Sequence, residues 1–156
     1  MNAETIVEKI NQDIKDKVQE VSLAAPRRVQ VKVAREQLNA VLTYLKEQFG
    51  YTHLGTISGV DLGDHFEVVY HMSSAVATVN VRILTPRGDP KIPSTCTVIP
   101  GAILYERELQ DMFGLVVEDI PDPRPLLLAD DWPAGQYPLR KDWIFDRPAE
   151  IIPGGA

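Results

Sequence analysis

The sequence has a single cysteine, Cys96, among its 156 residues. One thiol cannot form a disulfide within the chain, a structural zinc knuckle or an all-cysteine iron–sulfur site. The segment PSTCTVIP around it predicts a small side chain packed in the interior. A catalytic thiol would need a histidine beside it in space, and the sequence leaves that alternative open.

Long apolar runs and an excess of positive charge are missing as well. No stretch is long and apolar enough to span a bilayer, and the segment MNAETIVEKINQDIKDK has no apolar signal-peptide stretch. The net charge of −6 argues against a broad nucleic-acid surface. The sequence therefore predicts a cytoplasmic protein without direct membrane insertion. Any membrane association would come through a partner.

The residues that are present predict one globular domain. Apolar residues make up 44% of the chain, and a chain of this length can bury about 70% of its unfolded surface. Helical spacing predicts helices over residues 4–18 and over the segments REQLNAVLTYLKEQFG and GAILYERELQDMFG. Strands are predicted at 29–33, 52–60, 65–72 and 76–84, with TPRGDPKIPS as a loop. The prediction is an α+β fold over residues 1–114, with helices packed on a mainly antiparallel sheet.

After Gly114 the sequence changes character. Seven of the twelve prolines lie in residues 115–156, which excludes long helices and central strands there. The same segment holds three consecutive leucines and both tryptophans, which a disordered linker would lack. We therefore predict an extended, proline-rich C-terminal arm over residues 115–156. Two alternatives remain for it: the arm wraps a partner subunit, or it folds back over its own sheet.

The segment ERELQDMFG concentrates charge on the last predicted helix. Arg107 and Asp111 are four residues apart and can pair, whereas Glu108 and Asp111 are three apart and repel. Asp111 lies in the last turn, where the helix dipole disfavours an anion by about 0.3–1 kcal/mol. We expect cations from the arm or a partner to meet Glu106 and these carboxylates. The candidates within the chain are Arg124, Arg140 and Lys141, and the alternative is a solvated charged face.

Several motifs together resemble a known family. YERELQDMFG, PDPRPLLLADDWP and YPLRKDW are similar to the signature of the 30-kDa subunit family of respiratory complex I, the C subunits of NADH-quinone oxidoreductases. GYTHLGTISGVD and HFEVVYHMSS resemble the strands that precede that signature, so the resemblance covers about residues 50–143. The family implies an α+β domain whose C-terminal stretch wraps the large catalytic subunit and which holds no cofactor itself. The forms DPRPLLL and DDWP, with Asp119 and Ile120 before the first proline, resemble the counterpart in membrane-bound nickel–iron hydrogenases.

The resemblance implies a non-catalytic scaffold subunit of a membrane-bound, ion-pumping oxidoreductase complex, peripheral to the cell membrane. In the hydrogenase form such a complex links ferredoxin, formate or carbon monoxide oxidation to proton reduction; the alternative is the 30-kDa subunit of a respiratory NADH- or quinone-type complex I. The chain would clamp the large catalytic subunit to the small iron–sulfur subunit, whose clusters, and possible nickel–iron centre, lie outside this chain. The interface residues carried over by position are Glu106, Arg107, Glu108, Asp111, Gly114, Pro121, Arg124, Asp131, Trp132, Leu139, Arg140, Lys141 and Asp142.

A small metalloenzyme is the alternative from another functional class. His65, Glu67 and His71 share one face of a predicted strand, and two imidazoles with a carboxylate can hold zinc or iron. His65 and His71, however, are separated by roughly 20 Å along an extended strand, which one metal cannot bridge without a sharp bend. A free-standing soluble binding module is disfavoured because the apolar residues of the arm would promote aggregation of a lone domain.

Overall fold

The structure is a computed structural model that describes residues 2–144 of the chain. It contains three α-helices: α1 Ala3–Asp13, α2 Leu38–Phe49 and α3 Ile103–Phe113. The strands are β1 Val18–Ala25, β2 Arg28–Val33, β3 His53–Asp61, β4 His65–Ser73, β5 Thr78–Pro86, β6 Lys91–Pro93 and β7 Val116–Glu118. The predicted α+β fold is confirmed. Residues 145–156, the end of the predicted arm, lie outside the described residues.

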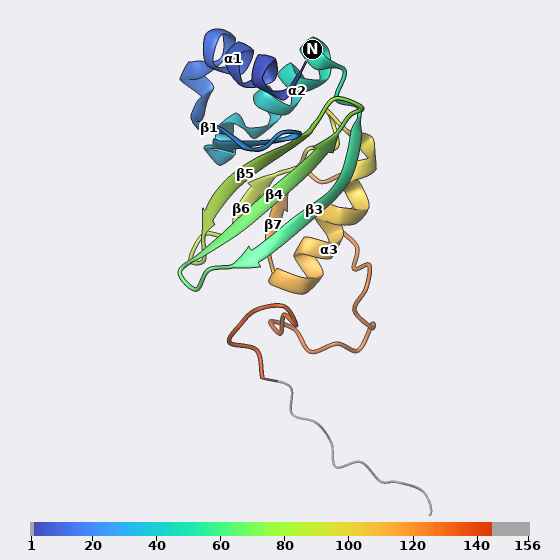
Figure 1. The fold of residues 1–156 in the computed structure, drawn as a ribbon. Coiled ribbons are helices and arrows are strands. Elements are labelled where there is room, and N and C mark those ends of the chain that lie inside the picture. Colours follow the sequence, from blue (N-terminus) through green and yellow to red (C-terminus); the bar gives the residue numbers. More distant parts are fainter. Residues whose placement is uncertain (1, 145–156) are drawn as a thin grey trace, which may run out of the picture.

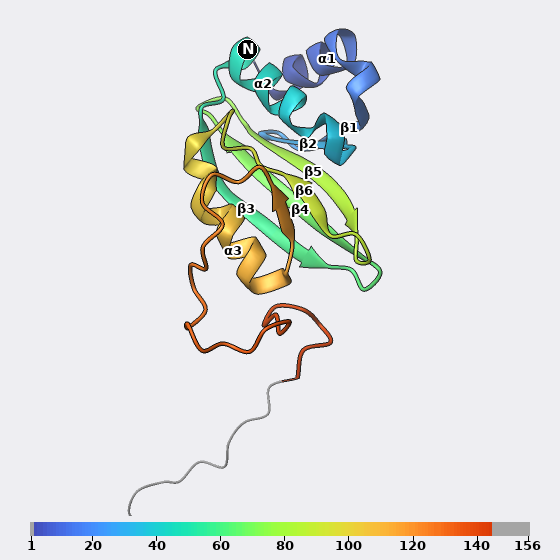
Figure 2. The same cartoon turned by 180° about the vertical axis from the view of Figure 1, so that it is seen from behind.

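Strands β1 to β5 form one sheet in the order β1-β2-β5-β4-β3. Only the β2–β5 pair is parallel, so the sheet is mainly antiparallel. Strand β4 shows why one face is buried: Phe66, Val68, Tyr70 and Met72 alternate with partly exposed residues along it. Figures 1 and 2 show α3 and the β6–β7 pair along this face, with α1 and α2 at the end near β1. The opposite face of the sheet is open.

Three strands were missed by the sequence analysis. Helix α1 ends at Asp13 rather than at Val18, because Ile14 leaves the helical region and a 3₁₀ turn follows. The predicted end of the helix was therefore wrong, and β1 begins where it was placed. Strand β1 lacks a clear alternation because it is an edge strand without a buried residue. Strands β6 and β7 have three residues each, too few to show a period.

Strand β7 attaches the first residues of the predicted arm to the domain. It pairs in parallel with β6, and Leu115 and Val117 are buried in the core. The chain turns away at Asp119, which has a positive φ of 60°. From there to Ile144 the described residues form neither helix nor strand. Within residues 2–144, no helix has the length and apolar character needed to cross a membrane.

Candidate functional site

Helix α3 is held close to the sheet and turns its charged side toward the arm. A Cβ atom on Gly59 of β3 would lie only 2.6 Å from the ring of Phe113, so glycine permits this close packing. Gly114 ends the helix in the left-handed conformation, with φ at 66°. Because Leu109 and Phe113 are buried against the sheet, Arg107 and Asp111 are directed to the side where the arm passes. We call the contact between α3 and the arm the junction, and we take it as the candidate functional site.

Glu106 lies under the junction and is fully buried. Its Oε1 accepts hydrogen bonds from the Thr95 N–H at 2.6 Å and the Thr95 hydroxyl at 2.8 Å. Its Oε2 accepts from the Ser94 hydroxyl at 2.7 Å and the Cys96 thiol at 3.3 Å. The expectation that a cation meets Glu106 was therefore wrong within the described residues, because neutral donors satisfy the carboxylate. Burial raises the pKa of the Cys96 thiol, and Cys96 is packed inside as predicted.

Arg107 and Asp111 both bind the main chain of the arm. The Arg107 guanidinium donates to the carbonyls of Arg124 at 2.7 Å and Pro125 at 2.9 Å. One Asp111 carboxylate oxygen, Oδ2, accepts three successive N–H groups, those of Leu126, Leu127 and Leu128, at 2.8, 2.7 and 3.3 Å. The pairing of Arg107 with Asp111 that their spacing allows is not formed. The three N–H groups compensate for the unfavourable place of Asp111 at the end of the helix.

The arm returns to the C-terminal end of α3 some dozen residues later. Leu139 N–H donates to the Met112 carbonyl at 3.1 Å, and Arg140 Nε donates to the Phe113 carbonyl at 2.7 Å. These donors satisfy carbonyls that have no partner within the helix. The Arg140 guanidinium also lies 4.3 Å from the centre of the Tyr137 ring. Tyr137 in turn packs on Gly114, where any side chain would overlap its ring.

A third attachment joins the arm to the end of β3. Asp61 is buried, and both its carboxylate oxygens accept from Arg87 Nη1, at 2.8 and 2.9 Å. Asp61 also accepts the N–H of Lys141 at 2.9 Å and that of Gly63 at 2.8 Å, while Arg87 forms an ion pair with Asp142. The sequence analysis assigned TPRGDPKIPS, the segment that holds Arg87, only to a loop and missed this contact. The two partners lie 26 residues apart, beyond any local pattern.

Asp61→Asn should lower the stability of the isolated chain at neutral pH and leave it unchanged in strong acid. Burial by itself raises the pKa of Asp61, but the hydrogen bonds from Arg87, Lys141 and Gly63 outweigh it and lower the pKa from 3.8 to about 2. A depression of this size is worth about 2 kcal/mol of unfolding free energy above pH 4, and it is lost as the pH falls towards 2.

Denaturant unfolding of both forms between pH 7 and pH 2 measures this difference. Asp16→Asn is the matched control, because the Asp16 side chain is exposed and makes no hydrogen bond among the described residues. A difference between wild type and Asp61→Asn that stays constant down to pH 2 would contradict the assigned role of the carboxylate.

The remaining predicted contact residues belong to the arm, except Glu108 of α3. The Arg124 side chain is 79% exposed and pairs with Asp122 at 2.6 Å. The predicted pairing of Arg124 with Glu106 or Asp111 is therefore not formed. The Arg124 guanidinium and N–H groups hold the pKa of Asp122 below its ordinary range. Trp132 lies 5.9 Å from Trp143, centre to centre, and donates its ring N–H to the Gln136 carbonyl. Pro121, Asp131 and Glu108 have no side-chain hydrogen bond among the described residues.

The three polar residues of the metalloenzyme alternative have separate partners. His65 contacts Asp64 at 3.1 Å, Glu67 binds Arg82, and His71 lies between Ser58 and Asn80. Among the described residues, no three histidine, cysteine or acidic side chains gather as a metal site.

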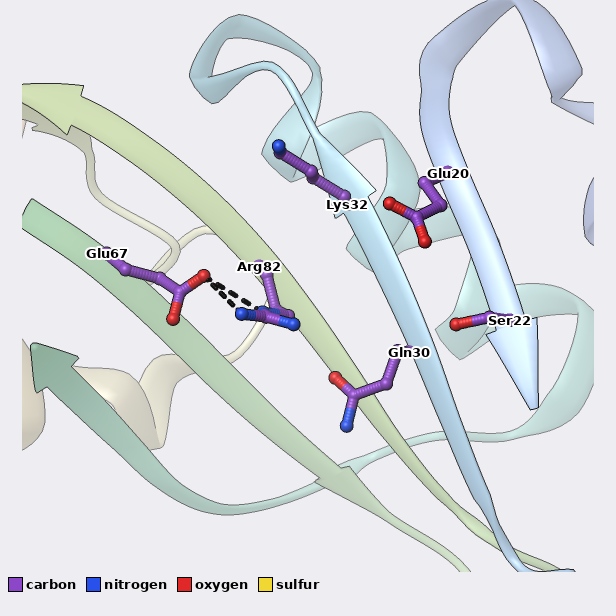
Figure 3. Close-up of a pocket in the computed structure, with 6 residues that line it drawn as sticks. All are labelled: Glu20, Ser22, Gln30, Lys32, Glu67 and Arg82. Carbon is purple, nitrogen blue, oxygen red and sulfur yellow. Dashed lines mark hydrogen bonds and ion pairs between the residues drawn. The ribbon is translucent and has the colours of Figure 1, made fainter. Parts of the chain in front are cut away.

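A hollow of about 300 Å³ lies on the open face of the sheet. Figure 3 shows the six residues that line it. Its ionised residues are two acids and two bases: Glu20, Glu67, Lys32 and Arg82. Because the two signs are balanced, the hollow does not favour a ligand of either charge. The Glu67–Arg82 ion pair spans two neighbouring strands, as expected of a solvated sheet face.

Comparison with known proteins matches residues 31–148 to the family described as the respiratory-chain NADH dehydrogenase, 30 Kd subunit. The chain belongs to this family. The resemblance noted in the sequence is thereby confirmed. Two solved structures have a similar fold. A chain of the membrane-bound sulfane sulfur reductase, an archaeal respiratory membrane complex, superposes with a TM-score of 0.80 and 26% identity over 90% of this chain and 85% of that one. The trypsin-resistant fragment of Nqo5 gives a TM-score of 0.65 and 25% identity over 78% and 99% of the two chains.

Relatives of the chain carry several names. The C subunit of F(420)H(2) dehydrogenase from Methanosarcina mazei is 34% identical over 149 residues, which cover 92% of both chains. The C subunit of NADH-quinone oxidoreductase from Rhizobium rhizogenes is 37% identical over 72% of this chain, which spans 58% of that relative. Formate hydrogenlyase subunit 5 of Escherichia coli is 42% identical over 52% of this chain, which spans 15% of that relative. The chain is thus a complex I-like subunit.

Proposed function

We propose that the chain is a non-catalytic scaffold subunit of a membrane-bound, complex I-like oxidoreductase complex, in which the arm clamps the large catalytic subunit to the small iron–sulfur subunit. The observation that carries this proposal is how α3 holds the arm. Arg107 and Asp111 bind carbonyl and N–H groups of residues 124–128, so the course of the arm is fixed without occupying most of its side chains. The side chains remain available to a partner.

The side chains left outside by this arrangement are those expected at an interface. Leu127 and Leu139 are 55% and 52% exposed, and Leu126 is 37% exposed. Large apolar side chains on a backbone that is already ordered bind with a smaller entropic cost than a disordered segment does. Arg124 adds an exposed guanidinium, a group enriched at protein–protein interfaces. The names of the relatives, which are subunits of oxidoreductases, support the same reading.

Within this proposal we favour a hydrogenase-type complex that links ferredoxin, formate or carbon monoxide oxidation to proton reduction and ion pumping. The formate hydrogenlyase relative supports it, and a respiratory complex with quinone reduction is the alternative. We propose that this chain holds no cofactor, that neighbouring subunits hold iron–sulfur clusters, and that the chain lies on the cytoplasmic side of the membrane as a peripheral part of the complex. The sequence of the co-purifying large subunit distinguishes the hydrogenase-type complex from the quinone-reducing one. A Cys-x-x-Cys pair near each end of that subunit indicates a nickel–iron site.

Arg124→Ala tests the clamp in the assembled complex. We expect the yield of complex with the large subunit to fall about tenfold, because a guanidinium at the interface no longer meets its partner. The isolated chain should unfold as the wild type does, within about 0.5 kcal/mol, because the side chain is exposed. Arg28→Ala is the matched control, since Arg28 is an exposed cation of β2, away from the arm. Equal yields from Arg124→Ala and Arg28→Ala would refute the proposed position of the interface.

A further inference from the structure

A pocket of about 260 Å³ lies between α3 and the turn of the arm. We call it the arm pocket. Pro125, Leu128 and Pro133 give it apolar walls, and the rings of Trp132 and Tyr137 line it as well. The Trp132 ring is held in place twice, by its N–H bond of 2.9 Å to the Gln136 carbonyl and by its contact with Trp143. The arm pocket is therefore formed before any partner arrives.

Acidic side chains line the arm pocket, and the two arginines beside it are engaged by main-chain carbonyls: Arg107 by that of Pro125 at 2.9 Å and Arg140 by that of Phe113 at 2.7 Å. Two of its twelve lining residues, Asp111 and Asp130, are acids, and none is a lysine or arginine. Asp111 is engaged, because its Oδ2 accepts three N–H groups of the arm. Asp130 makes no hydrogen bond or ion pair with the residues that the structure describes. The pocket thus combines aromatic and apolar walls with one uncompensated carboxylate.

We propose that the arm pocket receives a cationic side chain, an arginine or lysine, of the partner polypeptide. The inference rests on the proposed clamp and names the chemistry that the partner must present. An aromatic ring attracts a cation through its face, and a carboxylate completes the pairing. An anion would lie beside the Asp130 carboxylate here, and a purely apolar side chain would desolvate that carboxylate without giving it a partner. Charge complementarity therefore selects a cation.

The chain already shows this chemistry beside the pocket. Arg140 lies 4.3 Å from the centre of the Tyr137 ring and 5.2 Å from that of Phe66. That guanidinium belongs to the chain, binds the end of α3 and is not among the residues that line the arm pocket. The hollow on the open face of the sheet differs, since its own Lys32 and Arg82 already balance its acids.

Asp130→Asn in the full chain tests the inference, with co-expression of the large subunit and the affinity measured at low and high salt. Asp16→Asn is the matched control, because Asp16 is also an exposed acid without a hydrogen bond among the described residues, and it does not line the pocket. We expect Asp130→Asn to weaken assembly about tenfold at low salt and to reduce its salt dependence, because one charge pair is removed. Asp16→Asn should leave the affinity within about twofold of the wild type.

A second measurement uses the isolated full chain and follows the ¹⁵N resonance of the Trp132 ring N–H. N-acetyl-arginine methylamide should shift this resonance saturably, and N-acetyl-citrulline methylamide, which has the same shape without charge, should not. Equal shifts from the two probes, or saturation by a blocked leucine, would overturn the inference. If Arg124→Ala weakens assembly while Asp130→Asn does not, the arm pocket inference is wrong and the clamp stands. If neither variant weakens assembly, the clamp itself is wrong.

Discussion

Replacing Asp111 by alanine should detach residues 126–128 of the arm from α3 and abolish assembly, while the core stays folded. One carboxylate oxygen accepts three successive N–H groups, and no other acceptor of the described chain is bound to them. A hydrogen bond to a charged group contributes about 1.5–3 kcal/mol. The freed N–H groups can reach water once the arm moves away, so we expect a net loss of about 2–4 kcal/mol.

Two readouts separate release of the arm from loss of the fold. Amide hydrogen exchange at Leu126, Leu127 and Leu128 should accelerate strongly, whereas exchange in the sheet should remain slow. Co-purification with the large subunit should drop below detection. For the exchange measurement on the isolated chain, Glu108→Ala is the control, because Glu108 lies three residues earlier on α3, carries the same charge and makes no side-chain hydrogen bond in the described chain. Unchanged exchange at residues 126–128 would show that Asp111 does not hold the arm.

The periodic elements of the fold could be predicted because each carries its own signal. Strand β4 alternates buried and exposed residues over its full length, and the apolar stripe of α2 ends at Gly50 in the left-handed conformation expected of a helix stop. Strand β1 carries no such signal, since none of its residues is buried and it pairs at the edge of the sheet. Its formation depends on the tertiary partner β2 rather than on its own sequence.

The contacts of the site could not be predicted for a different reason. Counting charges on α3 led to an expectation of cations, but Glu106 is satisfied by hydroxyl, thiol and N–H donors, and Asp111 by N–H donors alone. A main-chain N–H is present at nearly every residue, so no sequence pattern marks the ones that bind a carboxylate. The residues that could be recognised from the family motif were the charged ones on the helix; their partners required the structure.

Helix α3 holds the arm through main-chain contacts, and this affects which partners the arm can bind. Arg107 and Asp111 recognise carbonyl and N–H groups, which stay the same when arm side chains change. The side chains of residues 124–128 can then differ between complexes without altering the course of the arm. An arm of fixed course and variable side chains fits relatives whose names differ as much as formate hydrogenlyase and NADH-quinone oxidoreductase.

Glu106→Ala should cause the largest loss of stability of any substitution discussed for this chain. The side chain is fully buried, and its carboxylate is the acceptor for donors of three successive residues, Ser94, Thr95 and Cys96. Alanine would leave these donors unsatisfied in the interior and open a cavity, at a cost of about 4 kcal/mol. The damage would spread, because Ser94 also joins α2 through Asn39 and β7 through the Glu118 carbonyl.

Glu106→Gln distinguishes lost hydrogen bonds from lost volume. Glutamine fills the same space and keeps one acceptor oxygen, which can serve the Thr95 N–H. Hydroxyl groups rotate and also accept, so the Ser94 hydroxyl can accept a hydrogen bond from the new amide. We therefore expect a loss of only about 1–2 kcal/mol for Glu106→Gln. Denaturant unfolding of the isolated chain should rank wild type above Glu106→Gln and Glu106→Gln above Glu106→Ala, with Glu108→Ala close to wild type. Equal losses for glutamine and alanine would mean that the negative charge itself, rather than the number of acceptors, holds the segment 94–96 against α3.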